Sequence, residues 1–138
     1  MIVRVLSTYG YRGRLEHEWR ESCIDPTWAD IEAALCRLDA GEFAGAALHT
    51  NDYRDWEPAT DAFAVTGGAG CYLVTCTVAG THKAAIINPD IAAGKDLVGV
   101  CKRDQGVWVS ERNVCRDLQV VLGLARQYAD KGQPSSAF

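Results

Sequence analysis

The sequence lacks the features that define several classes of protein. Its apolar runs fall far short of the roughly 20 residues that a membrane-spanning helix needs. No basic segment followed by a long apolar one opens the chain, as a secretion signal would require. With four prolines in 138 residues and 23% charged residues, it is also unlike a disordered or collagen-like chain. We therefore expect a cytoplasmic protein that does not interact with membranes.

An excess of positive charge is missing as well. The formal net charge is −4 at pH 7, whereas a protein that binds nucleic acid usually carries a basic patch. Nucleic acid is therefore not expected as a partner, and a basic protein partner is compatible with the charge.

The spacing patterns of metal sites and disulfide frameworks are also missing. The histidines stand singly at His17, His49 and His82, which is unlike the ligand spacing of a zinc site. The cysteines contain no CxxC pair, and without a secretion signal they are expected to be free thiols; they are Cys23, Cys36, Cys71, Cys76, Cys101 and Cys115. Cys71 and Cys76 lie in one expected strand, on opposite faces of it.

A catalytic or phosphate-binding motif is not found either. Gly67, Gly68 and Gly70 match neither GxGxxG nor GxxxxGK[ST], and a strand is expected after them, so a glycine-rich hairpin or bulge is the better interpretation. No cysteine has the local signature of a nucleophile. The sequence predicts no enzyme activity, no metal and no cofactor.

What the sequence does contain is alternating strand patterns and two helical stripes. The length fits one domain, residues 1–138. Strands are expected at residues 2–6, 15–23, 43–50, 63–78 with a pause at the glycines, 84–87, 97–101 and 107–109, with a turn at 9–13 and a loop at 51–60. The fold class is therefore α+β, a mainly antiparallel sheet of about six to seven strands packed against two helices.

The first helix has a recognisable start. Thr27 followed by Asp30 resembles a capping box, while Asp25 with Pro26 is a competing start. Gly41 is expected to end the helix. Its apolar stripe consists of Trp28, Ile31, Leu35 and Leu38.

The second helix is expected at the end of the chain, where apolar residues recur with helical spacing over residues 118–128. Asp117 is the best N-cap, with Asn113 as the alternative start. Gly132 and Pro134 are expected to end the helix.

The segment that differs most from ordinary surface is residues 51–57. It interleaves two large aromatic side chains with three carboxylates, which is typical of a binding hot spot for a basic protein: Asp52, Tyr53, Asp55, Trp56 and Glu57. Residues 25–61 carry a formal charge of −7, and the rest of the chain carries +3. The alternative is a solvated helix face followed by a loop whose Tyr53 and Trp56 cover the core.

Two further groups are candidates for the same binding role. Asp30, Glu32 and Asp39 form an acidic secondary face on and after the first helix. Trp108 and Glu111 on a late hairpin form a third.

Several short motifs in the chain resemble those of immunity protein family 1 of bacterial polymorphic toxin systems. They are residues 26–35 with Leu38 and Asp39, Gly67 and Gly68 before Tyr72 and Val74, and residues 125–128 with Gly132 and Pro134. The resemblance extends from about residue 19 to the end. It implies a small cytoplasmic α+β domain, encoded beside a secreted toxin, that binds the toxin and blocks its active site; several such toxins are nucleic-acid deaminases or nucleases.

The resulting hypothesis is an immunity protein without enzymatic activity. A toxin that acts on nucleic acid presents a basic cleft, which an acidic surface with aromatic anchors can occupy. The alternative is a small-molecule-binding or enzymatic domain with a pocket between sheet and helices. The oligomeric state is left open by the sequence.

Overall fold

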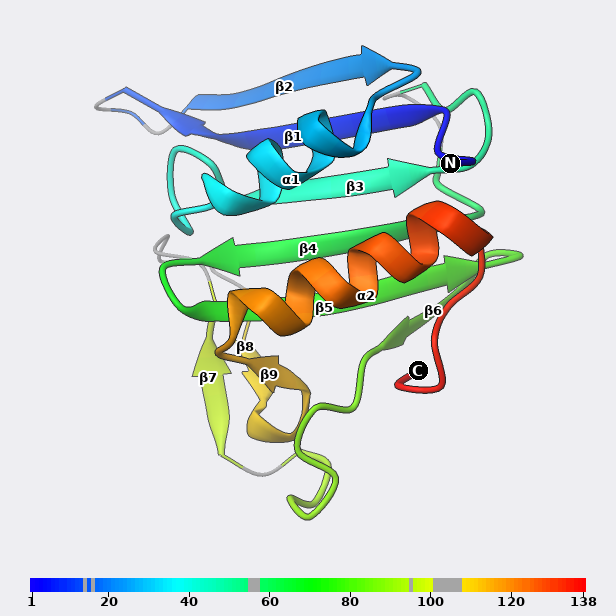
Figure 1. Ribbon diagram of the computed structural model, residues 1–138. Coiled ribbons are helices and arrows are strands. Elements are labelled where there is room, and N and C mark those ends of the chain that lie inside the picture. Colours follow the sequence, from blue (N-terminus) through cyan, green and yellow to red (C-terminus); the bar gives the residue numbers. More distant parts are fainter. Residues whose placement is uncertain (14, 16, 55–57, 95, 101–107) are drawn as a thin grey trace.

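The computed structural model describes residues 1–13, 15, 17–54, 58–94, 96–100 and 108–138. The main sheet is antiparallel, in the order β2-β1-β3-β4-β5-β6, with β9 also paired to β5 (Figure 1). Its strands are β1 Val5–Arg12, β2 His17–Ile24, β3 Gly45–His49, β4 Ala62–Gly68, β5 Cys71–Val78, β6 Thr81–Ala84 and β9 Val114–Cys115. A separate pair consists of β7 Leu97–Gly99 and β8 Trp108–Ser110. The predicted α+β class is confirmed.

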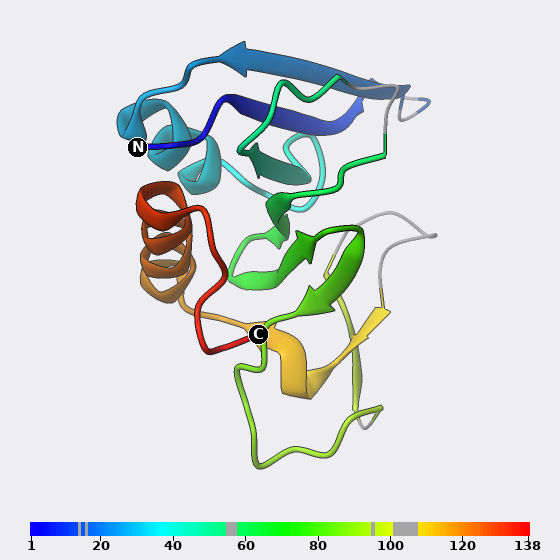
Figure 2. The ribbon, with the colours of Figure 1, turned by 90° about the vertical axis from the view of Figure 1, so that its right-hand side faces the viewer.

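Two helices, α1 Trp28–Cys36 and α2 Leu118–Lys131, cover one face of the sheet (Figures 1 and 2). Because successive strand residues point to opposite faces, every second residue of the central strands enters the layer between sheet and helices. This layer is the hydrophobic core. Its most deeply buried large side chains include Ile31, Leu35, Leu48, Phe63, Val65, Val74 and Val121.

Helix α1 starts as its sequence predicts. Thr27 is the N-cap, its side chain accepts a hydrogen bond from Asp30 N, and Asp30 Oδ2 accepts one from Thr27 N at 2.8 Å. The capping box is confirmed, and the Asp25–Pro26 start is not used. The helix ends at Cys36, earlier than Gly41, because Asp39 Oδ1 accepts hydrogen bonds from Gly41 N and Phe43 N and so holds this segment in a turn.

Helix α2 also confirms its predicted ends. Asp117 is the N-cap and accepts a hydrogen bond from Gln119 N, and Gly132 is the left-handed C-cap. The alternative start at Asn113 is wrong, because residues 111–113 form a 3-10 turn that leads into β9.

The turn predicted at residues 9–13 is wrong, because β1 continues through Gly10 to Arg12. Gly10 pairs with Trp19 on β2. A Cβ at Gly10 would lie 1.7 Å from the carbonyl oxygen of Glu42. This glycine therefore permits a close approach of two backbone segments and does not form a turn.

The predicted fifth strand, residues 84–87, is wrong in its position, because the strand ends at Ala84 and residues 85–87 lie outside it. Ala79 and Gly80 both have positive φ, and Thr81 pairs directly with Val78. A two-residue turn with positive φ at both positions is typical of a tight hairpin, so β6 spans Thr81–Ala84. The glycine-rich segment around residue 68 is the β4–β5 hairpin, as predicted.

The described cysteines are free thiols, as expected: Cys23, Cys36, Cys71, Cys76 and Cys115. Cys76 lies in the core, whereas Cys71 Sγ approaches the carbonyl of Gly99 on β7. Burial raises the pKa of Cys76 to about 11. Cys101 lies outside the described residues. In the part of the chain that the structure describes, no helix is long and apolar enough to span a membrane.

Candidate functional site

The sheet face away from the helices, which we call the open face, is the principal candidate site. Two segments far apart in sequence lie on its side of the sheet: the described residues between β3 and β4, and the β7–β8 pair (Figure 2). The first contains the predicted partner-binding residues Asp52 and Tyr53, and the second contains Trp108. Both described helices lie on the opposite face of the sheet.

A cavity of about 360 Å³ lies on the open face. The floor of the cavity consists of three small side chains, Ser7 on β1, Ala47 on β3 and Ala64 on β4. Because these side chains are short, they leave space above the sheet. Larger side chains surround the floor, and they carry most of the polar groups that line the cavity. They are Tyr9, Arg20, His49, Tyr53, Thr77 and His82.

The chain after β3 is attached to the open face by an aromatic stack. The rings of His49 and Tyr53 are parallel within 3°, with centroids 3.7 Å apart. His49 is 2% exposed, and its Nε2 is hydrogen-bonded to Ser7 Oγ at 3.2 Å. One face of the Tyr53 ring therefore stacks on His49, and the rest of the side chain forms a wall of the cavity.

The pair of Ser7 and His49 has the residue types of a nucleophile and its base. Access to it is restricted, however, because the Tyr53 ring covers the imidazole and His49 is almost fully buried. A substrate would have to displace Tyr53 to reach the ring. The arrangement is better suited to holding the loop on the sheet than to proton transfer.

Polar contacts also order the rest of the cavity wall. Tyr9 Oη lies 3.5 Å from Thr66 Oγ1, and the Arg20 guanidinium lies 6.0 Å from the centroid of the Tyr9 ring. Across β5 and β6, Thr77 Oγ1 is hydrogen-bonded to His82 Nδ1 at 3.0 Å. The groups that could contact a ligand or an inserted side chain are thus held in defined positions.

The predicted acidic loop is only partly described. Tyr53 lines the cavity, and Asp52 is an exposed residue whose carboxylate lies 3.7 Å from Arg4. Arg4 also forms an ion pair with Asp25 at 3.4 Å. The other predicted loop residues, Asp55, Trp56 and Glu57, lie outside the described residues.

The acidic secondary face is separated from that loop by the sheet. Glu32 is exposed on α1, on the side of the sheet that carries the helices. Asp30 belongs to the capping box, and hydrogen bonds from Thr27 lower the pKa of its carboxyl. Asp39 accepts hydrogen bonds from the Gly41 and Phe43 amides. The predicted acidic residues that the structure describes are therefore not brought together in one surface.

The late hairpin presents an apolar pair to solvent. Trp108 is 66% exposed and Leu97 is 60% exposed. The register pairs Gly99 with Trp108 and Leu97 with Ser110, so Leu97 and Trp108 share one face of the β7–β8 ribbon. Glu111 has a local role, because Arg116 Nη2 donates to its Oε2 at 3.0 Å and lowers the pKa of its carboxyl.

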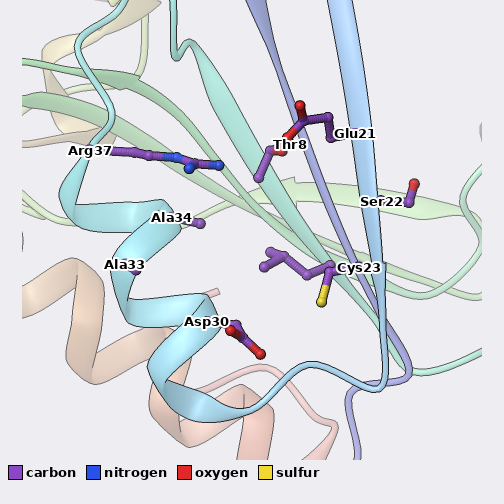
Figure 3. Close-up of a pocket in the computed structure, with 9 residues that line it drawn as sticks. Thr8, Glu21, Ser22, Cys23, Asp30, Ala33, Ala34 and Arg37 are labelled. Atoms are coloured by element: carbon purple, nitrogen blue, oxygen red, sulfur yellow. The ribbon is translucent and has the colours of Figure 1, made fainter.

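A second cavity lies between α1 and strands β1 and β2, where the alternative hypothesis requires a pocket (Figure 3). It has a volume of about 230 Å³. Thr8, Glu21 and Cys23 line its strand side, and Asp30 and Arg37 line its helix side. Asp30 is already bound to Thr27, and Arg37 lies 4.8 Å from the centroid of the Phe43 ring. These charges are engaged in local contacts.

Comparisons with known proteins bear on the fold alone. No family model matches the chain, and no curated protein matches it in sequence. Its fold is similar to that of a solved structure, a hypothetical protein from Neisseria gonorrhoeae. The TM-score is 0.60 at 8% identity, and the match covers 97% of this chain and 92% of that chain.

Sequence reasoning missed most of the cavity residues. Ser7, Arg20, His49 and His82 come from four different strands, and only the strand order and register bring them to one face. One signal was available, since alanines repeat at alternate positions in β4 and so indicate a low sheet surface.

Proposed function

We propose that this chain is an immunity protein that binds a cognate bacterial toxin domain, one that acts on nucleic acid as a deaminase or nuclease does, and occludes its active site. The protein acts without enzymatic activity of its own and works in the cytoplasm. The observation that carries the proposal is the position of the β3–β4 loop and the β7–β8 pair. The described residues of these two separate segments, each with the composition of a binding site, lie on the same side of the sheet, away from the helices.

The occupant that best fits this face is a protein with a basic surface. The segment between β3 and β4, residues 50–61, contains four acidic residues and one basic residue. Charge of one sign beside aromatic anchors favours fast and specific association with a partner of opposite charge. Trp108 and Leu97 supply exposed apolar area on the β7–β8 pair. The open-face cavity, whose floor consists of small side chains, can receive a protruding side chain of the partner.

Co-expression with the toxin domain encoded by the neighbouring gene tests the proposal. The expected result is protection of the cells and a stable complex of the two proteins in a pull-down. A neighbouring product that is not a toxin, or a toxin that this protein neither binds nor neutralises, contradicts the proposal.

A matched pair of variants tests the docking face. Ala47→Arg places a large charged side chain on the floor of the open-face cavity, and Gln119→Arg places the same side chain on the exposed surface of α2. We expect Ala47→Arg to abolish protection and Gln119→Arg to retain it. The circular dichroism spectra of both variants should match the parent. The opposite pattern would place the interface on the helix side.

A small-molecule-binding domain is the second candidate. The open-face cavity has a volume within the range of ligand pockets, roughly 300–1,000 Å³, and the polar groups of Ser7, Arg20 and His82 line it. A screen of small ligands by thermal shift separates the two functions. A ligand that stabilises the parent but not Ala47→Arg would favour this second function.

A further inference from the structure

Strand β2 is an uncovered edge of the main sheet. It is eight residues long and pairs with β1 over its whole length. Among the described residues no strand pairs with its outer side, and both views show β2 as the outermost element (Figures 1 and 2). A long edge strand is able to pair with another strand unless charge, proline or a bulge prevents it. β2 contains no proline, and its register with β1 is continuous.

The hydrogen bonds to β1 determine which backbone groups of β2 point outward. On the β3 side of β1, Tyr9 O accepts a hydrogen bond from Ala44 N at 2.9 Å, and Tyr11 N donates one to Gly41 O at 3.2 Å. The odd-numbered residues of β1 therefore face β3, and its even-numbered residues face their odd-numbered partners on β2. Because hydrogen-bonded pairs alternate along antiparallel strands, the odd-numbered residues of β2 bond to β1. The amides and carbonyls of Glu18, Arg20 and Ser22 therefore point away from the sheet.

The charges of β2 are self-complementary in one register. If two copies pair their β2 edges about a twofold axis perpendicular to the sheet, one residue of β2 lies at the axis. A residue a given number of positions before this central residue in one copy then faces the residue the same number of positions after it in the other copy. With Trp19 at the centre, Glu18 of each copy faces Arg20 of the other. In the same register Glu21 faces His17. With Arg20 at the centre, by contrast, Arg20 faces its own copy, which is unfavourable.

The side chains around Trp19 are already arranged for this register. Arg20 Nη2 donates to Glu18 Oε1 at 2.9 Å within one strand, which shows that the two charged groups lie on the same face and within reach of each other. Trp19 is held in place, because its Nε1 donates to Glu42 O and its ring packs edge-on against Phe43. The central side chain therefore needs little ordering on association.

We propose that the chain forms a homodimer through antiparallel pairing of its β2 edges, centred on Trp19. The outward backbone groups of Glu18 and Arg20 would join the two sheets into one, as in other cases of strand addition. Two symmetry-related pairs of Glu18 and Arg20 determine the register. The helices of both copies then lie on one side of the joined sheet and the open faces on the other. The inference does not depend on the proposed toxin partner.

A charge-reversal series tests this dimer in the absence of any partner. Analytical ultracentrifugation over a dilution series should give about twice the monomer mass for the parent chain. Arg20→Glu turns both opposite-charge pairs into like-charge pairs, so dimerisation should weaken about tenfold or more. The double variant Glu18→Arg with Arg20→Glu restores opposite charges across the interface, and its dimerisation should return to the level of the parent.

The outcomes distinguish this interface from any other. Arg126→Glu on α2 is the matched control, since it reverses an arginine that is similarly exposed, and it should leave the dimer unchanged. All of these residues are exposed, so folding should not be affected. A monomeric parent at the highest concentration overturns the proposal. A dimer that Arg20→Glu leaves intact, or that the double variant fails to restore, overturns it equally.

Discussion

Truncation of Trp108 is the sharpest mutational prediction for the docking face. A tryptophan side chain buries about 150–250 Å² in a protein interface. Trp108 is 66% exposed, so about 130 Å² of it is available to a partner, which corresponds to about 3 kcal/mol at 25 cal/mol per Å². Trp108→Ala should therefore weaken toxin binding by about 100-fold, which is on the scale of a hot spot.

The same truncation should have little effect on folding. The Trp108 ring lies over Gly99, at an ordinary contact distance of 3.7 Å from the position of a Cβ there, and most of the ring faces solvent. The free energy of unfolding should change by less than about 1 kcal/mol, as for other exposed positions. Binding measured by isothermal titration calorimetry and unfolding measured in urea separate the two effects.

Two companion variants define the result that would refute the reasoning. Leu97→Ala removes the apolar neighbour on the same ribbon face and should weaken binding to a smaller extent. Val120→Ala, at an exposed position of α2, should not change binding. If Trp108→Ala binds the toxin within a factor of about two of the parent, a change below 0.5 kcal/mol, the β7–β8 pair is not part of the interface.

Three further predictions concern folding. Gly10→Ala should lower the free energy of unfolding in urea by about 1–3 kcal/mol through overpacking against Glu42. Gly123→Ala, on the exposed side of α2 where a Cβ meets open space, should raise the free energy of unfolding by about 0.5–1 kcal/mol. Equal effects of the two substitutions would refute the close-approach role of Gly10. Thr27→Ala should cost about 1 kcal/mol by the same measurement, and Thr27→Ser should retain most of the capping energy. Burial raises the pKa of Tyr128 from 10 to about 12. As the pH rises above 10, the unfolded chain loses the phenol proton before the folded chain does. The free energy of unfolding should therefore fall between pH 10 and 12, by at most about 1.4 kcal/mol per pH unit. Tyr128→Phe should flatten the fall of stability in this range, and an unchanged slope in alkaline unfolding experiments would contradict the assignment.

Much of the fold could be predicted because its signals are local. The capping box at Thr27 and the caps of α2 depend on residues only a few positions apart, and all were confirmed. The error at Gly10 arose because a tertiary contact overrode a local signal. Gly10 was interpreted as a turn because glycine is common in turns, but its role is set by the Glu42 carbonyl, 32 residues later in the chain.

The candidate site was predictable only in part. Tyr53 and Trp108 were found because large aromatic residues in polar segments are unusual at the sequence level, and the structure places both on the side of the open face. The polar wall of the cavity was missed. Ser7 and His49 are 42 residues apart, and their hydrogen bond requires the pairing of β1 with β3.

The sequence by itself determined the two helices with their caps and most of the strands, because helical spacing, capping and alternation act within a few residues. The tertiary structure decided where the charges lie. Residues 25–61 carry a formal net charge of −7, against +3 for the rest of the chain, yet α1 and the described part of the β3–β4 loop lie on opposite sides of one sheet. Successive connections between strands can pass over opposite faces of a sheet, so segments that are close in sequence need not share a surface. The self-complementary edge of β2 likewise depends on strand order, which no local pattern specifies.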